Sequence, residues 1–310
     1  MKAQLLDILR AGEDYVSGEH LSTCLGISRV AVWKHIQKLK ACGYPIVSAS
    51  KGYRLDSDPD TLFPWDFPER ESRIHYHEEV TSTMDIAREL ARGGCPAFSV
   101  VIAGRQTRGR GRLQRKWKSS DGGLYFTLVV RPDLPAIHSA WVNFAASLEM
   151  ARVLRADYGV EAGVKWPNDI LVSGRKLAGM LSEMEVEGDL ITFVSIGMGV
   201  NVNNNTRGIE PPAISLKEIL GREVPRKTLL ARFLDRFENR MDHQSLESVI
   251  QEWKPYAVTP GQTVKIVTTR DIIEGVAVDV EPDGALLVRT DTGEIRRVVY
   301  GDCFHTGPSA

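Results

Sequence analysis

Residues 170–200 read ILVSGRKLAGMLSEMEVEGDLITFVSIGMGV, and this stretch decides the fold class. Ser173-Gly174-Arg175 and Glu187-Gly188-Asp189 are turn sequences, and they separate three apolar segments, 170–172, 176–185 and 190–200. Short turns between apolar segments are typical of hairpins, so the pattern predicts consecutive antiparallel strands. Strands that follow one another directly, with helices gathered elsewhere, favour an α+β fold over a doubly wound parallel sheet.

The segments on either side extend this sheet and supply its helices. Their apolar patterns predict strands at 73–77, 97–103 and 124–130, and helices at 84–92, 138–158, 228–244 and 246–254. From Pro260 onward short strands alternate with turns, which is typical of a small β-barrel. We therefore expect a mixed, mostly antiparallel α+β domain over 73–258 and a small β-barrel domain over 259–310.

Residues 1–57 predict a separate module of three short helices and a hairpin. Ser17 and Ser28 are suited to cap helices, and Val32, Ile36 and Leu39 give the third helix one apolar face. A hairpin with its turn at 50–52 follows, which completes a winged helix-turn-helix. Residues 58–72 belong to an acidic segment with three prolines and are expected to form a linker.

The charge of this first module favours DNA binding. Six Lys and Arg residues and no carboxylate lie between Ser28 and Arg54. A helix fits the major groove of DNA, where cations contact phosphates and polar side chains reach base edges. The alternative is a packing or dimerisation module whose charges are only solvated. The expected DNA-binding residues are Ser28, Arg29, Trp33, Lys34, Gln37, Lys38 and Lys51.

The overall composition mainly excludes classes of protein. The chain has 310 residues, 43% of them apolar, and 39 Lys and Arg against 40 Asp and Glu. This excludes a disordered polyelectrolyte and a protein that coats nucleic acid through overall positive charge. No apolar run suits a membrane span and no targeting segment is evident, so we expect a cytoplasmic protein without a membrane partner. Four scattered cysteines and the histidine spacing predict no metal site in the chain.

The most unusual segment is 104–118, GRQTRGRGRLQRKWK. Seven cations and no acid lie between Arg105 and Lys118, and Gly109 and Gly111 let the backbone approach a ligand closely. The glycine spacing matches neither common nucleotide-binding loop. The segment predicts an anion-binding loop inside an enzyme, with an arginine-rich RNA contact as the alternative. We refer to residues 104–118 as the Gly/Arg loop.

Two further motifs combine polar groups with turns. Lys165-Trp166-Pro167-Asn168-Asp169 precedes Arg175-Lys176-Leu177-Ala178-Gly179 across the first hairpin, and these groups suit binding of phosphate, ribose or magnesium. Residues 197–203 end a strand with small residues, where Asn201 can hydrogen-bond a ligand. Each motif alone is also compatible with an ordinary turn.

Taken together, in this order and at these spacings, the motifs resemble the biotin protein ligase family. They are Gly109-Arg110-Gly111-Arg112 with Arg115-Lys116-Trp117, the two motifs around the hairpin, and Gly199-Val200-Asn201-Val202-Asn203. With the winged helix in front, the chain resembles the bifunctional members, which also repress the biotin operon. The resemblance implies a catalytic domain like that of class II aminoacyl-tRNA synthetases and an SH3-like C-terminal domain.

The resemblance also implies a two-step reaction and a regulatory role. Biotin and ATP, with Mg²⁺, would form biotinyl-5′-AMP, from which biotin passes to a lysine of the biotin carboxyl carrier protein of acetyl-CoA carboxylase. Biotinyl-5′-AMP would also act as corepressor and favour a homodimer on operator DNA.

The same resemblance assigns roles to individual residues. Biotin binding falls to Ser82, Thr83, Met84, Gln106, Arg110, Gly111, Arg112 and Lys176. Adenylate or ATP binding falls to Arg110, Arg112, Trp117, Lys165, Asn168, Asp169 and Asn201, and catalysis to Arg112, Lys165 and Lys176. Met84 departs from the pattern, because many relatives carry Asn there.

Three alternative functions are a biotin-sensing repressor without catalysis, a ligase without DNA binding, and a related lipoate enzyme. The intact motif 165–169 and Lys176 disfavour the first, the basic stretch 28–54 disfavours the second, and the winged helix and C-terminal barrel disfavour the third. The C-terminal domain is compatible with supporting the active site, docking the carrier domain or capping the fold.

Overall fold

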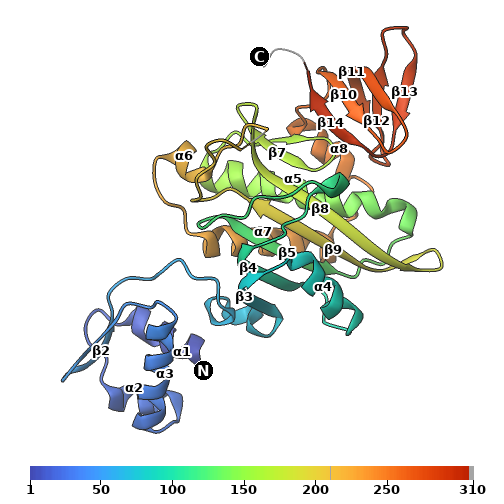
Figure 1. Ribbon diagram of the computed structural model, residues 1–310. Coiled ribbons are helices and arrows are strands. Elements are labelled where there is room, and N and C mark those ends of the chain that lie inside the picture. The colour runs from blue at the N-terminus through green and yellow to red at the C-terminus, as the bar shows by residue number, and fades with distance from the viewer. Residues whose placement is uncertain (210, 307–310) are drawn as a thin grey trace. The chain divides into compact units, whose positions relative to one another are not determined.

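The computed structural model describes residues 1–209 and 211–306. They form two compact units, Met1–Ile74 and the chain from His75 onward (Figure 1).

The first unit is a winged helix-turn-helix, as expected. Its elements are α1 (Lys2–Ala11), α2 (Gly18–Leu25), α3 (Arg29–Ala41) and the antiparallel hairpin β1 (Ile46–Ala49) and β2 (Gly52–Leu55). Ser17 Oγ accepts a hydrogen bond from the His20 N–H, and Ser28 Oγ accepts one from the Ala31 N–H, so both serines cap their helices. The buried core is Leu5, Leu6, Leu9, Leu21, Val32, Ile36, Leu39, Tyr44 and Ile46.

The segment after the wing folds back onto this core. It contains two short 3-10 helices, η1 (Pro64–Asp66) and η2 (Pro68–Arg73). Phe63 and Trp65 pack against the core, the Tyr44 hydroxyl donates to Asp66 at 2.6 Å, and Trp65 Nε1 donates to the Tyr44 oxygen at 3.0 Å. Much of the range expected to be a linker, 58–72, therefore contributes to the first unit.

A seven-stranded sheet forms the centre of the second unit, in the order β3-β4-β5-β9-β8-β7-β6. The ladders from β4 to β6 are antiparallel, so the expected hairpins and the α+β class are confirmed. The short strand β6 and the pairing of β5 with β9 were not expected. The strands are β3 (Ile74–Val80), β4 (Ser99–Gln106), β5 (Leu124–Val130), β6 (Gly163–Lys165), β7 (Asp169–Val172), β8 (Arg175–Glu187) and β9 (Leu190–Val200).

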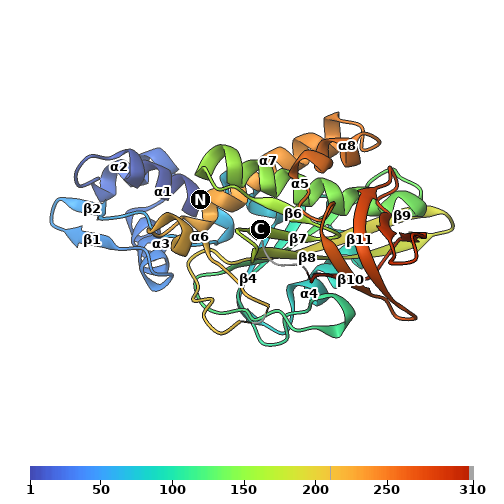
Figure 2. The ribbon, with the colours of Figure 1, turned by 90° about the horizontal axis from the view of Figure 1, so that it is seen from above.

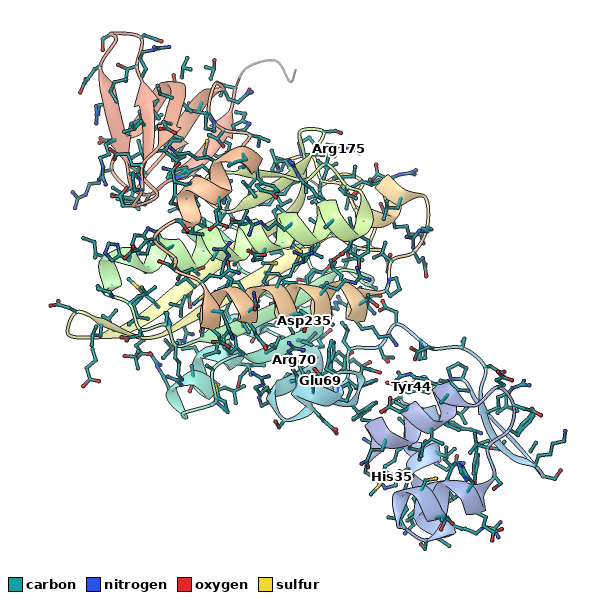
Figure 3. The ribbon with its side chains drawn as sticks, turned by 180° about the vertical axis from the view of Figure 1, so that it is seen from behind. His35, Tyr44, Glu69, Arg70, Arg175 and Asp235 are labelled. Atoms are coloured by element: carbon teal, nitrogen blue, oxygen red, sulfur yellow. The ribbon has the colours of Figure 1, made fainter. Side chains whose placement is uncertain are left out.

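Helices cover both faces of this sheet. Figure 2 shows α5, α7 and α8 on one side and α4 on the other, and Figure 3 shows α5 and α7 side by side. The bounds are α4 (Thr83–Arg92), α5 (Ser139–Tyr158), α6 (Leu216–Leu220), α7 (Arg226–His243) and α8 (Val249–Trp253), with short 3-10 helices η3 (Arg112–Gln114), η4 (Ala136–His138) and η5 (Lys254–Tyr256).

The C-terminal part of the second unit is a five-stranded antiparallel sheet in the order β13-β12-β11-β10-β14. Gly284 and Gly293 adopt positive φ angles of 90° and 85° in the expected turns. Within residues 1–209 and 211–306 no ladder joins β13 to β14, so the expected barrel is not closed by hydrogen bonds. The strands are β10 (Thr263–Val267), β11 (Ile272–Val280), β12 (Leu286–Arg289), β13 (Ile295–Val298) and β14 (Asp302–His305).

A buried ion network joins the three helices on one face of the central sheet. Arg240 on α7 is fully buried and donates to Glu149 on α5 and Glu252 on α8, both at 2.6 Å. Arg152 on α5 donates to the same two carboxylates at 2.9 Å. The hydrogen bond from Arg240 is the main reason why the pKa of Glu252 falls to about 2.

Replacing Arg240 by Met should lower the free energy of unfolding by about 3 kcal/mol, because Glu149 stays buried with fewer donors. Urea unfolding measures this loss. The stabilisation from Glu252 is complete above pH about 4.5 and is lost as the pH falls through about 2, and the variant should weaken this acid dependence. Arg232→Met is the matched control on α7: Arg232 pairs with Asp157 but is 48% exposed, so its loss should cost under about 1 kcal/mol. Equal losses in both variants would contradict the prediction.

Candidate functional site

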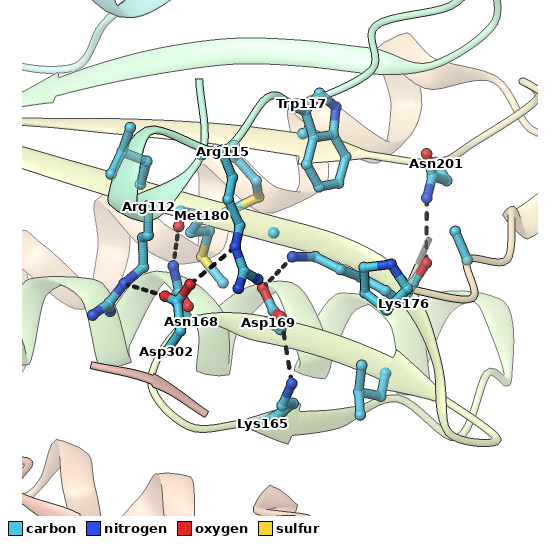
Figure 4. A pocket seen from close by; sticks show the side chains of 18 of the residues that line it. Arg112, Arg115, Trp117, Lys165, Asn168, Asp169, Lys176, Met180, Asn201 and Asp302 are labelled. Carbon is cyan, nitrogen blue, oxygen red and sulfur yellow. Dashed lines mark hydrogen bonds and ion pairs between the residues drawn. The ribbon is translucent and has the colours of Figure 1, made fainter. Parts of the chain in front are cut away.

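A cavity of about 850 Å³ opens in the second unit, and the Gly/Arg loop lies over it (Figure 4). The ends of β7, β8 and β9 form its floor, and residues of β14 form a wall. Every residue to which the resemblance assigns a role in ligand binding or catalysis lines this cavity: Ser82, Thr83, Met84, Gln106, Arg110, Gly111, Arg112, Trp117, Lys165, Asn168, Asp169, Lys176 and Asn201.

Three charged side chains meet on one face of the sheet. Lys176 Nζ lies 2.6 Å from Asp169 Oδ1, and Lys165 Nζ lies 4.0 Å from Asp169 Oδ2. Lys165 faces Asp169 directly in the β6–β7 ladder. Between β7 and β8 the register shifts by one residue, so that Leu171 pairs with Lys176. Since residues 169 and 171 share a face, this bulge brings Lys176 to the face of Asp169.

Two glycines make room for the indole of Trp117. Gly179 on β8 and Gly199 on β9 pair with each other, and a Cβ added to either would come within 3.0 Å of the Trp117 ring. Lys176 Nζ lies 5.4 Å from the centre of the same ring. The glycines of two separate motifs therefore act together to seat one aromatic side chain of the Gly/Arg loop.

Hydrogen bonds at the inner end of the cavity fix the orientation of Gln106. Its Oε1 accepts from the Thr83 N–H at 2.9 Å, and its Nε2 donates to Ser119 Oγ at 3.0 Å. Thr127 Oγ1 donates to the Thr83 hydroxyl at 2.8 Å. The buried Ser82 Oγ and Trp117 Nε1 have no hydrogen-bond partner among the described residues, so both are free to bind a ligand.

The side chains of Asn168 and Asn201 are engaged with the backbone around the cavity. Asn168 Nδ2 donates to the Met180 carbonyl, and Asn201 Nδ2 donates to the Lys176 carbonyl at 3.3 Å. Asn204 Nδ2 in turn donates to Asn201 Oδ1 at 2.9 Å. These contacts hold β8 at Lys176 and at Met180.

The arginines of the Gly/Arg loop contact acidic residues from several elements. Arg110 lies 3.0 Å from Glu183 on β8 and 3.1 Å from Asp85 on α4. Arg112 and Arg115 both approach Asp302 on β14, at 3.5 and 3.2 Å. Burial lowers the pKa of the Arg112 guanidinium, against the opposing effect of Asp302.

No motif predicts that β14 lines the cavity, yet Asp302, Cys303, Phe304 and His305 all do so. The backbone N–H of Trp166 donates to Thr259 Oγ1 at 2.9 Å, and Thr259 Oγ1 lies 3.2 Å from His305 Nε2. Burial, aided by Lys165, lowers the pKa of His305 to about 4, so Nε2 of the neutral ring can accept a hydrogen bond from the Thr259 hydroxyl. The one sequence feature that could have indicated this contact is Trp166, because a buried tryptophan needs a hydrogen-bond acceptor for its ring N–H.

The residues expected to contact DNA lie on the surface of the first unit. Arg29, Lys34, Gln37, Lys38 and Lys51 are exposed, and so is Trp33, with 51% of its surface accessible. A groove between α3 and the wing is lined by Arg29, Val30, Trp33, Gln37 and Lys51, among others. Ser28 uses its hydroxyl to cap α3.

Within the described part of the chain, no cluster of three or more His, Cys, Asp or Glu side chains is arranged to hold a metal ion. None of the helices described is long and apolar enough to span a membrane.

Family models match three parts of the chain. Residues 76–201 match the biotin/lipoate A/B protein ligase family, residues 2–54 match an HTH domain, and residues 259–306 match the biotin protein ligase C-terminal domain.

Curated relatives match nearly the whole chain. The bifunctional ligase/repressor BirA of Bacillus subtilis (strain 168) is 32% identical over 319 residues, which cover 97% of this chain and 98% of the relative. The protein of the same description from Escherichia coli (strain K12) is 29% identical and covers 93% and 92%.

Solved structures match the larger part of the chain. A biotin protein ligase from Aquifex aeolicus in complex with biotin and ATP has a TM-score of 0.62 at 26% identity, covering 75% of this chain and 97% of that one. A biotin protein ligase from Leishmania major in complex with biotinyl-5-AMP has a TM-score of 0.51 at 26% identity, covering 74% and 99%.

We predict that the imidazole of His305 titrates near pH 4 in the folded chain, well below the ordinary value of about 6.5. Below pH about 6.5 the unfolded chain binds a proton that the folded chain does not, so stability should fall as the pH drops from about 6.5 towards 4. NMR titration of the ring measures the pKa, and urea unfolding measures the stability. His305→Asn should reduce this fall in stability, whereas His243→Asn, at an exposed position, should not. A His305 ring that titrates near 6.5 would contradict the prediction.

Proposed function

The chain belongs to the biotin protein ligase family, in its bifunctional ligase/repressor form, and we propose how its residues carry out the two activities. The second unit activates biotin with ATP and transfers it to the biotin carboxyl carrier protein of acetyl-CoA carboxylase. The first unit binds operator DNA and represses transcription. The observation that carries the ligase assignment is the meeting of all four sequence motifs around one cation-rich cavity.

In the first step a carboxylate oxygen of biotin attacks the α-phosphorus of ATP, and pyrophosphate leaves with the electron pair of the broken P–O bond. Negative charge builds up on the phosphoryl oxygens and on the leaving group. Arg112, Lys165 and Lys176 offset that charge, and Asp169 orients both lysines towards the same space. Catalysis by fixed cations requires no nucleophile from the protein.

Biotin itself occupies the inner end of the cavity, near Ser82, Thr83, Met84 and Gln106. The free Ser82 hydroxyl supports this assignment, because the ureido ring of biotin presents a carbonyl oxygen and two N–H groups. Arg110, Gly111, Arg112 and Lys176 complete the set around the carboxylate end. The adenylate side falls to Arg110, Arg112, Trp117, Lys165, Asn168, Asp169 and Asn201.

In the second step the amine of the acceptor lysine attacks the carbonyl carbon of the mixed anhydride. A C–N bond forms, the C–O bond to phosphate breaks, and AMP leaves with that electron pair. The same cations stabilise the departing phosphate, and the Gly/Arg loop excludes water that would hydrolyse the anhydride.

Mg²⁺ would be bound together with ATP. Asp169 and Glu161 both line the cavity, and carboxylate oxygens are the ligand type that Mg²⁺ prefers. Of the two residues, only Asp169 belongs to a sequence motif. When bound, the ion neutralises phosphate charge.

Lys176→Met should lower the rate of biotin adenylation at least about 100-fold, because it removes a charge aimed at the transition state. Pyrophosphate release with biotin and ATP measures this rate, and transfer to apo carrier domain reports the whole reaction. Lys217→Met is the matched control, since Lys217 is an exposed lysine on α6 that pairs with Glu223. Wild-type rates for Lys176→Met would overturn the catalytic assignment.

The DNA-binding half of the proposal rests on the exposed basic surface of α3 and the wing. Lys34→Ala and Lys38→Ala should each weaken binding to duplexes that the chain selects from a random library, while adenylation stays unchanged. Each lost phosphate contact should reduce the slope of log K against log salt by about 0.9. A parallel fall in adenylation would instead mean that the substitution damages the fold.

We also propose that biotinyl-5′-AMP favours a homodimer, which would align two winged helices on a two-fold operator. The coupling requires that the adenylate bind the dimer more tightly than the monomer. Sedimentation of the chain with and without biotin and ATP tests this, and identical association constants would refute it.

A further inference from the structure

We propose that Asp302, the first residue of β14, is a positioning residue for adenylation: it holds Arg112 and Arg115 of the Gly/Arg loop, and so lets the C-terminal sheet close the cavity. This role rests on the proposed ligase function. It gives the C-terminal sheet a task within the active site.

The contacts of Asp302 support this role. Its side chain is 10% exposed, and it lies 3.5 Å from Arg112 Nε and 3.2 Å from Arg115 Nε. Arg112 also donates from Nη2 to the carbonyl oxygen of Gly301, the preceding residue, at 3.0 Å. The guanidinium of Arg115 lies 4.8 Å from the centre of the Phe304 ring, two residues further along β14. Two arginines of one loop are thus held by one short strand, across almost two hundred residues of sequence.

The geometry of these contacts leaves other arginine nitrogens available. Asp302 takes the Nε side of each guanidinium, and Arg112 Nη1 and both Nη atoms of Arg115 form no hydrogen bond with any described residue. A carboxylate at Nε can therefore fix the orientation of a guanidinium and still leave N–H donors that can bind a phosphate. Asp302 Oδ2 is itself buried without a hydrogen-bond donor, so its contact with Arg115 can tighten when a substrate orders the loop.

The backbone between the two arginines needs such support. Leu113 lies between them with φ 46° and ψ 44°, a left-handed conformation that residues other than Gly rarely adopt. Two backbone hydrogen bonds, from the Gly111 N–H to the Arg115 carbonyl at 2.7 Å and from the Arg115 N–H to the Arg112 carbonyl at 3.0 Å, support this turn from within the loop, and the side-chain contacts of its arginines add to them. The anchors at Arg112 and Arg115 flank the strained residue on both sides, and Asp302 is the one carboxylate among the described residues that contributes to both.

Limited trypsin digestion of the full chain without ligands tests the anchor directly. Asp302→Asn keeps the size of the side chain but removes its charge. It should raise the rate of cleavage after Arg112 and Arg115 about tenfold relative to cleavage after the exposed Arg108 of the same loop, as mass spectrometry resolves. Asp302→Glu, which restores the carboxylate, should return cleavage towards the wild-type rate.

Kinetics test what the anchor does for the reaction. Asp302→Asn should raise KM for ATP about tenfold with a smaller change in kcat, and in Arg115→Gln the same substitution should have a reduced effect, because one partner is already missing. Asp291→Asn is the matched control: it makes the same chemical change on the same sheet, in the exposed turn between β12 and β13, and should leave both readouts unchanged.

Three results would overturn the proposal. Unchanged cleavage and unchanged KM would mean that Asp302 does not hold the loop. A lower KM for ATP would mean that Asp302 competes with phosphate for the arginines. Cleavage that rises equally after Arg108, together with a lower melting temperature, would mean a purely structural role. If the wild type fails to adenylate biotin, the proposed function fails, while the digestion still decides whether Asp302 anchors the loop.

Discussion

The second unit depends on keeping unlike charges close in a cavity that is only partly open to water. Arg112, Arg115, Lys165 and Lys176 converge on two carboxylates, Asp169 and Asp302. Without these carboxylates the cations would repel one another and face a large desolvation cost. Two carboxylates do not balance these four cations, so positive charge remains in excess around them. That excess attracts an anionic substrate, and the two carboxylates keep the cations pointing inwards until it arrives.

The elements that carry these charges were predictable where local pattern decides structure. The hairpins of 170–200, the strand 124–130 and the serine caps of α2 and α3 follow from turn residues, alternation and capping chemistry. Local pattern does not determine which strands become neighbours. The pairing of β5 with β9, the strand β6 and the packing of residues 61–66 onto the first unit depend on contacts between distant segments.

The residues that line the cavity likewise fall into two groups, those that sequence motifs identify and those that they do not. The motifs identified the residues of the Gly/Arg loop and the central sheet, because glycines, cations and turns carry chemical meaning at short spacing. They did not identify Asp302, Phe304 or His305, which lie in an ordinary strand sequence with no unusual feature. These residues reach the site because Trp166 hydrogen-bonds to Thr259 and to the Gly284 carbonyl, which docks the C-terminal sheet against the motif 165–169.

Because of the bulge between β7 and β8, the position of the Lys176 ammonium depends on the number of residues in this hairpin. Lys176 and its neighbour Leu177 differ in direction, with Leu177 fully buried, and the extra residue decides which of them faces Asp169. Deleting one residue in this hairpin would exchange an ammonium for a leucine without altering any motif residue. Inserting two residues would preserve which side chains face Asp169, whereas inserting one residue would turn them to the opposite face of the sheet. Homologous sequences are therefore best compared here by hairpin length as well as by residue identity.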